Sequence, residues 1–170
     1  MVGRRVLISA VLLLLAVLIE VTVLAPLDFP GATPALVLVI VVILAGQFGA
    51  LSGALAGFAG GLLLDIAPPA AGTIGVTALL LTVVGYAAGR FAESDDRSWW
   101  SLAIVSGLAA PIVVLAGAVI GGLLGDPRVR WDEVVPLMLT GAGYALALGL
   151  LLGLPLRRLC RWVVPEAYPR

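Results

Sequence analysis

The segment GQFGALSGALAGFAGGLLLD, residues 46–65, decides how this chain folds. Within it, glycine recurs at every fourth position: Gly49, Gly53, Gly57 and Gly61. A second row of small residues runs beside the first: Ser52, Ala56 and Gly60. Residues four apart share one face of an α-helix, and in lipid such smooth faces let helix backbones approach closely. The segment therefore predicts a membrane helix packed tightly against a neighbouring helix.

The composition of the rest of the chain agrees with a lipid environment. Of 170 residues, 62% are hydrophobic and 12% are charged, whereas about a quarter of residues are charged in soluble domains. A spanning helix needs roughly 20 apolar residues, so this length allows five or six spans and no second domain. The apolar run after Arg4 and Arg5 extends to Ala25, longer than the ~7–15 residue core of a secretory signal, and Pro26 follows it. We expect it to be a retained first helix.

Hydropathy predicts four clear spans, each bounded by charge, proline or tryptophan: residues 6–25, 73–91, 99–124 and 134–156. The segment 34–64 is ambiguous, because as one helix it would be about 46 Å long at roughly 1.5 Å per residue. That is too long for one span and slightly short for two. If it turns near residues 46–49, it supplies spans at 34–46 and 49–65.

The arginines favour the six-span alternative, since arginine-rich short loops stay in the cytoplasm. Six spans place both termini inside, together with most of the arginines: Arg4, Arg5, Arg90, Arg97, Arg157, Arg158, Arg161 and Arg170. Only Arg128 and Arg130 then lie outside. Five spans would invert this distribution. We therefore predict an all-α integral membrane protein, a single domain over residues 1–170 with six transmembrane helices.

Several chemistries find no support in the residue inventory. The net charge is zero, which indicates no nucleic-acid partner. The chain has no histidine, and its single cysteine, Cys160, can form neither an internal disulfide nor a multi-cysteine metal site. No nucleophile lies near a base in the sequence, and no lysine follows the glycines as in a phosphate-binding loop. We expect no catalytic, metal or cofactor site.

Two acidic residues inside or beside apolar spans are candidate polar anchors. Asp65 follows Gly61 by four residues and should extend the same helix face. It could cap the element that follows the Pro68 turn or serve a functional role. Glu20 lies about one turn from the end of the first span and should face protein. Arg128 or Arg130 could neutralise Glu20, or it could be protonated or reach the headgroups.

An internal repeat is a further hypothesis. GGLLLD at residues 60–65 matches GGLLGD at residues 121–126, and a Gly-Tyr pair follows each, at 85–86 and at 143–144. Spans three and four would then repeat as spans five and six, as in some transporters. Because glycine and leucine are abundant here, chance is an equally open explanation.

The order of these features resembles the rod shape-determining protein MreD family. The resemblance covers about residues 34–90: a short second helix, a glycine-rich third helix ending in GLLLD, a Pro/Gly turn, and the sequence GYAAGR at residues 85–90. It implies a fold similar to the substrate-binding (S) component of vitamin transporters. Gly85 and Tyr86 would join the four glycines of the third span as helix-packing or partner-binding residues.

The resemblance also implies a non-enzymatic scaffold in the bacterial inner membrane that binds MreC within the cell-elongation complex. That complex includes the RodA glycosyltransferase, a class B penicillin-binding protein and, in many bacteria, MreB, so the role would be to organise peptidoglycan synthesis. Two alternatives stay open: a substrate-binding subunit of a vitamin-type transporter, and a channel or proton-coupled transporter that uses Glu20.

Overall fold

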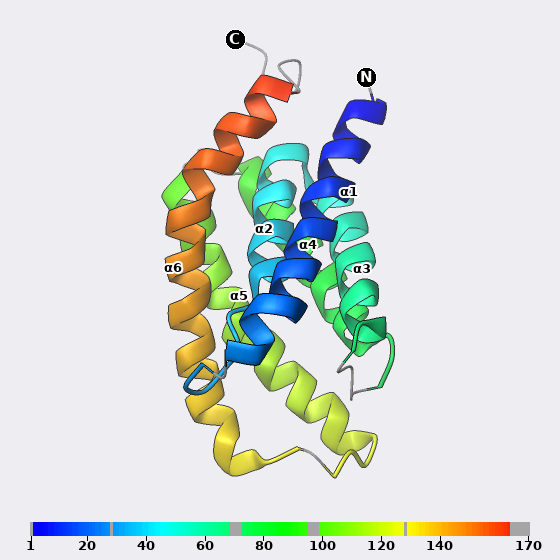
Figure 1. The fold of residues 1–170 in the computed structure, drawn as a ribbon, viewed down its shortest axis with the longest axis vertical. Coiled ribbons are helices and arrows are strands. Elements are labelled where there is room, and N and C mark those ends of the chain that lie inside the picture. The colour runs from blue at the N-terminus through cyan, green and yellow to red at the C-terminus, as the bar shows by residue number, and fades with distance from the viewer. Residues whose placement is uncertain (1, 28, 69–72, 95–98, 128, 164–170) are drawn as a thin grey trace.

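The fold is entirely helical in the residues described by the computed structural model, which are 2–27, 29–68, 73–94, 99–127 and 129–163. The six α-helices are α1 (Val2–Ile19), α2 (Leu36–Phe48), α3 (Ala50–Ile66), α4 (Val76–Ser94), α5 (Trp99–Leu123) and α6 (Trp131–Val163). A π-helical turn (Glu20–Leu24) and a 3-10 turn (Ala25–Leu27) extend α1. Consecutive α-helices alternate in direction, so the start of α1 and the end of α6 lie at the same end of the bundle (Figure 1).

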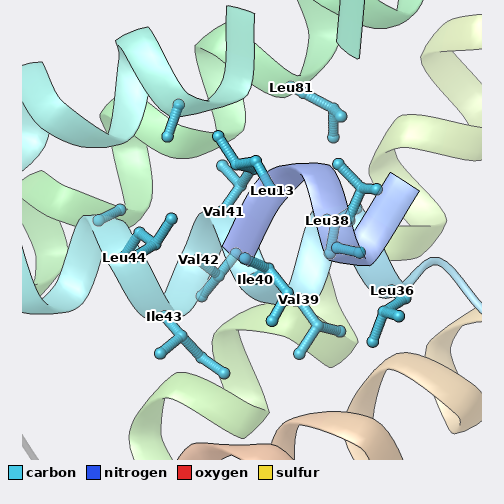
Figure 2. Close-up of a cluster of buried hydrophobic side chains, with 14 of the residues drawn as sticks. Leu13, Leu36, Leu38, Val39, Ile40, Val41, Val42, Ile43, Leu44 and Leu81 are labelled. Carbon is cyan, nitrogen blue, oxygen red and sulfur yellow. The ribbon is translucent and has the colours of Figure 1, made fainter. Parts of the chain in front are cut away.

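Helix α2 forms the centre of the bundle. It contacts the other five α-helices, and all of its residues from Leu36 to Gln47 are buried. Its side chains point in every direction towards the surrounding helices, where they meet residues such as Leu13 of α1 and Leu81 of α4 (Figure 2). A helix that is apolar on all sides is stable only when it is enclosed in this way. The hydrophobic core is therefore one helix wrapped by five others.

The remaining helices pack around α2 as two antiparallel pairs and one crossing helix. The pairs are α3 with α4 and α5 with α6, and α1 lies across α2 and α3 (Figure 1). Helix α3 ends where Ala67 takes an extended conformation (φ −70°, ψ 131°), as expected for a residue that precedes a proline. Pro68 thus ends the glycine-rich helix just after Asp65.

The all-helical prediction is confirmed, and each predicted range overlaps one of the six α-helices. The clearest difference is α6, which starts before residue 134 and continues beyond 156. Asp132 and Glu133 lie in its first turn, where a carboxylate interacts favourably with the helix dipole. Pro136 therefore lies inside the helix rather than at its start.

In the part of the chain that the structure describes, three helices are long and apolar enough to cross a membrane individually: Gly3–Leu27, Trp100–Leu123 and Trp131–Cys160. The other three apolar helices are shorter: Leu36–Phe48, Ala50–Ile66 and Val76–Ala92. The shortest is the central one, since the 13 residues of α2 extend about 20 Å at roughly 1.5 Å per residue. Five surrounding helices shield most of it from lipid.

Candidate functional site: a glycine seam and two carboxylate caps

Glycines of α3 lie directly against the backbone of α4. A methyl group added to any of three glycines would overlap a backbone atom of α4: Gly53 meets the Gly85 carbonyl, Gly57 the Leu81 carbonyl, and Gly61 the Ala78 Cα. We call these six residues the glycine seam. Because the two helices are antiparallel, each four-residue step along α3 is matched by a step of three or four residues along α4. The predicted small-residue face of α3 is therefore the face that packs within the chain.

Gly89 extends the contact on the α4 side and was missed as a packing residue in the sequence analysis. A methyl group at Gly89 would overlap the Cα and N atoms of Ala50, at the start of α3. The signal was present in the sequence, because Gly85 and Gly89 are themselves four residues apart. The small residues of α4 thus pack against the small residues of α3 over most of the length of the two helices.

Gly49 has a different role from the one predicted for it. It lies between α2 and α3 rather than inside a helix, with φ of +88° and ψ of 176°. Only glycine adopts this backbone conformation without strain. Its N–H donates to the carbonyl oxygen of Ala45 at 2.9 Å and so closes α2. Gly49 therefore reverses the chain in a single residue, and the helix-packing glycines of α3 begin at Gly53.

Tyr86 lies beside the glycine seam but not in it. Gly85 is buried against Gly53, whereas Tyr86 is 53% exposed. Other large apolar side chains are exposed on the same helix, including Leu79 and Val83, which recur with Tyr86 at helical spacing. Within the described residues, no hydrogen bond to the Tyr86 hydroxyl is present. The seam thus packs one face of α4 against α3, and within the described residues the face with Tyr86 stays exposed.

Asp65 caps helix α4 from the end of α3. Its Oδ2 atom accepts hydrogen bonds from the N–H groups of Gly75, at 2.8 Å, and Ala78, at 3.1 Å. The first N–H groups of a helix have no partner inside the helix, and a carboxylate there also interacts favourably with the helix dipole. Because Asp65 follows Gly61 on the same face of α3, packing along the glycine seam places its carboxylate next to the start of α4. The capping alternative is the one that the structure shows.

We expect Asp65→Ala to lower the thermal stability of the protein in detergent, because it leaves two partly buried N–H groups without an acceptor. The cost should be about 1–3 kcal/mol, seen as a lower melting temperature. Asp65→Asn keeps an oxygen at the same place and should recover part of the loss. Equal melting temperatures for the wild type and Asp65→Ala would show that the cap contributes nothing.

Glu20 forms a similar cap on α2 from the end of α1. Its Oε2 atom accepts a hydrogen bond of 2.7 Å from the N–H of Val37, in the first turn of α2. Glu20 begins the π-helical turn of α1, a local widening that often coincides with functional positions. The suggested arginine partner is not seen at Arg130, which pairs with Glu133 at 2.9 Å, and Arg128 lies outside the described residues. Glu20 therefore faces protein, as expected, with a helix N-terminus as its partner.

Both caps lie at the end of the bundle opposite to the start of α1 (Figure 1). A third contact at this end joins α6 to the segment before α2. The Thr140 hydroxyl accepts a hydrogen bond of 2.9 Å from the N–H of Ala32, and the Tyr144 hydroxyl donates to the Pro30 carbonyl at 3.3 Å. The Tyr144 ring also meets the edge of Phe29, with centroids 5.7 Å apart. Polar groups at this end therefore fix the loops between helices.

The two proposed repeat units do not pack alike. Gly85 is in the glycine seam, whereas a methyl group at Gly143 would meet nothing within 4 Å. Gly121 lies against Val129, and Gly122 lies against Trp131. Both of these partner residues come after the end of α5 in the sequence. The matching sequences therefore have different structural roles in the two halves.

The described residues contain no group of three or more histidine, cysteine, aspartate or glutamate side chains that could hold a metal ion. What they contain is a set of close helix contacts and helix caps in an apolar bundle. These features define an all-helical membrane protein organised by backbone packing. The model of the family "rod shape-determining protein MreD" matches residues 3–127, about three quarters of the chain.

The chain belongs to the MreD family, so the resemblance noted in the sequence is confirmed. The matched range includes Glu20, the glycine seam and Asp65, and it ends before α6. Membership implies a role in determining rod shape. Comparison with curated proteins and with solved structures found no match.

Proposed function

We propose that this protein is a non-enzymatic adaptor of the bacterial cell-elongation complex. In this proposal it crosses the inner membrane six times, with both termini in the cytoplasm, and binds MreC. Membership of the MreD family supports the role, and the alternating helix directions support the topology. RodA and a class B penicillin-binding protein would be further partners, direct or through MreC, and MreB would join them from the cytoplasm.

The observation that carries the adaptor proposal is the uncovered face of α4. Its opposite face is held by the glycine seam, so the helix presents Tyr86 on a rigid support. Tyrosine combines a large apolar surface with a hydroxyl that seeks a hydrogen-bond partner, which makes it frequent in protein interfaces. Glu20 and Asp65, the two acidic residues that the sequence analysis singled out, already cap helices. Recognition by an exposed surface fits this arrangement better than transport through polar groups.

A pull-down in gentle detergent, followed by mass spectrometry, tests the proposal. Recovery of MreC would support the adaptor. Recovery of an energy-coupling ATPase without MreC would contradict it and favour the substrate-binding subunit of a vitamin-type transporter. A thermal-shift screen of small ligands gives an independent check of that second outcome.

We expect Tyr86→Ala to weaken MreC binding about tenfold, which corresponds to about 1.4 kcal/mol, and to leave the melting temperature of the isolated protein unchanged. The reason is that Tyr86 is half exposed and outside the seam. Leu151→Ala is the matched control, because Leu151 is 70% exposed on α6. Equal MreC recovery by wild type and Tyr86→Ala would remove this face of α4 from the interface.

A further inference from the structure

A groove lies between the first halves of α1 and α3, beside the core contacts described above. Its volume is about 430 Å³, within the ~300–1,000 Å³ typical of small-molecule sites. The two helices run in the same direction from the same end of the bundle (Figure 1). Lining residues extend from Arg5 to Leu13 on α1 and from Leu51 to Ala59 on α3. At roughly 1.5 Å per residue, the groove is about 12 Å long.

The three polar lining residues of the groove lie towards one end, and the rest of its lining is apolar. Arg5, Ser9 and Ser52 line the end near the start of both helices. Deeper along the groove, the lining residues are apolar and include Leu13, Ala56 and Ala59. This gradient, from a cation and hydroxyl groups to an apolar lining, is complementary to a molecule with an anionic head and a hydrocarbon chain.

The polar groups at this end have no partner within the described part of the chain. Arg5 is partly buried, and no salt bridge to it occurs among these residues. No hydrogen bond to the Ser9 or Ser52 hydroxyl is present there either. Other helical hydroxyl groups donate to the carbonyl oxygen four residues earlier, as those of Thr22, Thr82 and Ser106 do. The cation and both hydroxyl groups are therefore available to a bound group.

We propose that this groove binds a phospholipid with an anionic headgroup. The phosphate would accept hydrogen bonds from Arg5, Ser9 and Ser52, and one acyl chain would lie along Leu13, Ala56 and Ala59. Charged hydrogen bonds between arginine and phosphate are strong and directional. Basic pockets between membrane helices on the cytoplasmic side are suited to such headgroups, and the proposed topology places Arg5 on that side. An apolar partner helix would instead leave the Arg5 charge unpaired.

Lipid titration of the purified protein tests the charge recognition. The probes are phosphatidylglycerol, phosphatidylcholine with the same acyl chains, and inorganic phosphate, with native mass spectrometry and melting temperature as readouts. We expect phosphatidylglycerol to be retained and to raise the melting temperature, and the other two to have little effect. Equal binding of the two lipids would overturn the proposal. Equal protection by inorganic phosphate would reduce the site to an anion site and overturn the acyl-chain assignment.

Two pairs of variants locate the lipid. Arg5→Gln should weaken phosphatidylglycerol binding at least tenfold, whereas Arg4→Gln removes the same charge from an exposed neighbour outside the groove and should bind normally. Equal loss in both variants would indicate unspecific surface attraction and contradict the proposal.

Ala59→Leu should fill the groove and reduce lipid binding at an unchanged melting temperature. The control is Ala147→Leu, at an exposed position of α6. Normal lipid binding by Ala59→Leu would overturn the assignment. A second outcome would also overturn it: the wild type binds no lipid, and Ala59→Leu loses MreC recovery. The groove would then hold a partner helix. Lipid binding and MreC recovery are separate readouts, so either proposal can fail alone.

Discussion

Replacing Gly57 with leucine should prevent the bundle from assembling in its native form. The Cβ atom of any side chain at this position would overlap the backbone carbonyl of Leu81. No change of rotamer can remove a clash between Cβ and the backbone of a neighbouring helix. Overpacking a core costs about 1–3 kcal/mol when side chains can adjust, and here α3 and α4 would have to separate. We expect low yield of folded protein, a broad or absent melting transition and loss of MreC recovery. Gly53→Leu should behave in the same way.

Gly143→Leu is the matched control for these variants. Gly143 lies inside α6 in an apolar membrane helix, but a methyl group there would meet nothing within 4 Å. The substitution should therefore leave expression and melting close to those of the wild type. If Gly57→Leu and Gly143→Leu melted alike, close contact of the α3 and α4 backbones would not be the basis of stability. Gly57→Ala adds a graded test, because even its single methyl group overlaps Leu81.

Glu20→Ala should produce the second largest loss of stability. The N–H group of Val37, at the start of the buried central helix, would lose its carboxylate acceptor, and water has little access to it because Val37 is 0% exposed. An unsatisfied buried donor costs about 1–3 kcal/mol. Because α2 contacts all five other helices, an unstable start of α2 should affect the whole bundle. The measurement is the melting temperature in detergent, with Thr22→Ala, at an exposed neighbouring position, as the control.

Glu20→Gln separates a cap from a proton pathway. Glutamine keeps an oxygen that can accept the Val37 N–H, so this variant should retain most of the stability that Glu20→Ala loses. A protein that only uses Glu20 as a cap should show no ion or proton flux in proteoliposomes, with either side chain. A flux in the wild type that disappears in Glu20→Gln, at normal melting temperature, would revive the transporter alternative.

Local patterns predicted the parts of the site that depend on helix periodicity. The four-residue spacing placed Gly53, Gly57, Gly61 and Asp65 on one face, and the Pro/Gly turn after Asp65 indicated a cap. The shared face follows from about 3.6 residues per turn, and the turn from the missing N–H of proline; whether Asp65 caps a helix or serves another role was left open by the sequence. Gly49 obeyed the same spacing, but its positive φ could not be recognised from spacing alone. A glycine that reverses the chain and a glycine that packs a helix look the same in sequence.

Partners distant in the chain could not be predicted in the same way. Glu20 was expected to face protein, yet nothing in its neighbourhood indicated that it would reach Val37 rather than an arginine. The contact of Tyr144 with Pro30 joins residues 114 positions apart. Such pairings depend on how the helices are arranged around α2, and many arrangements of the same apolar helices would bury similar surfaces.

The sequence by itself determined that this chain is a set of apolar helices, roughly where they lie along the chain, and which family it belongs to. Hydropathy, proline, glycine and charge act locally, so they can be read from neighbouring residues. Only the tertiary structure decided that α2 is the enclosed centre, that α3 and α4 meet backbone to backbone, and that Glu20 and Asp65 each cap the next helix. These depend on the relative positions of helices in space, because packing and hydrogen bonding act between groups that the sequence places far apart.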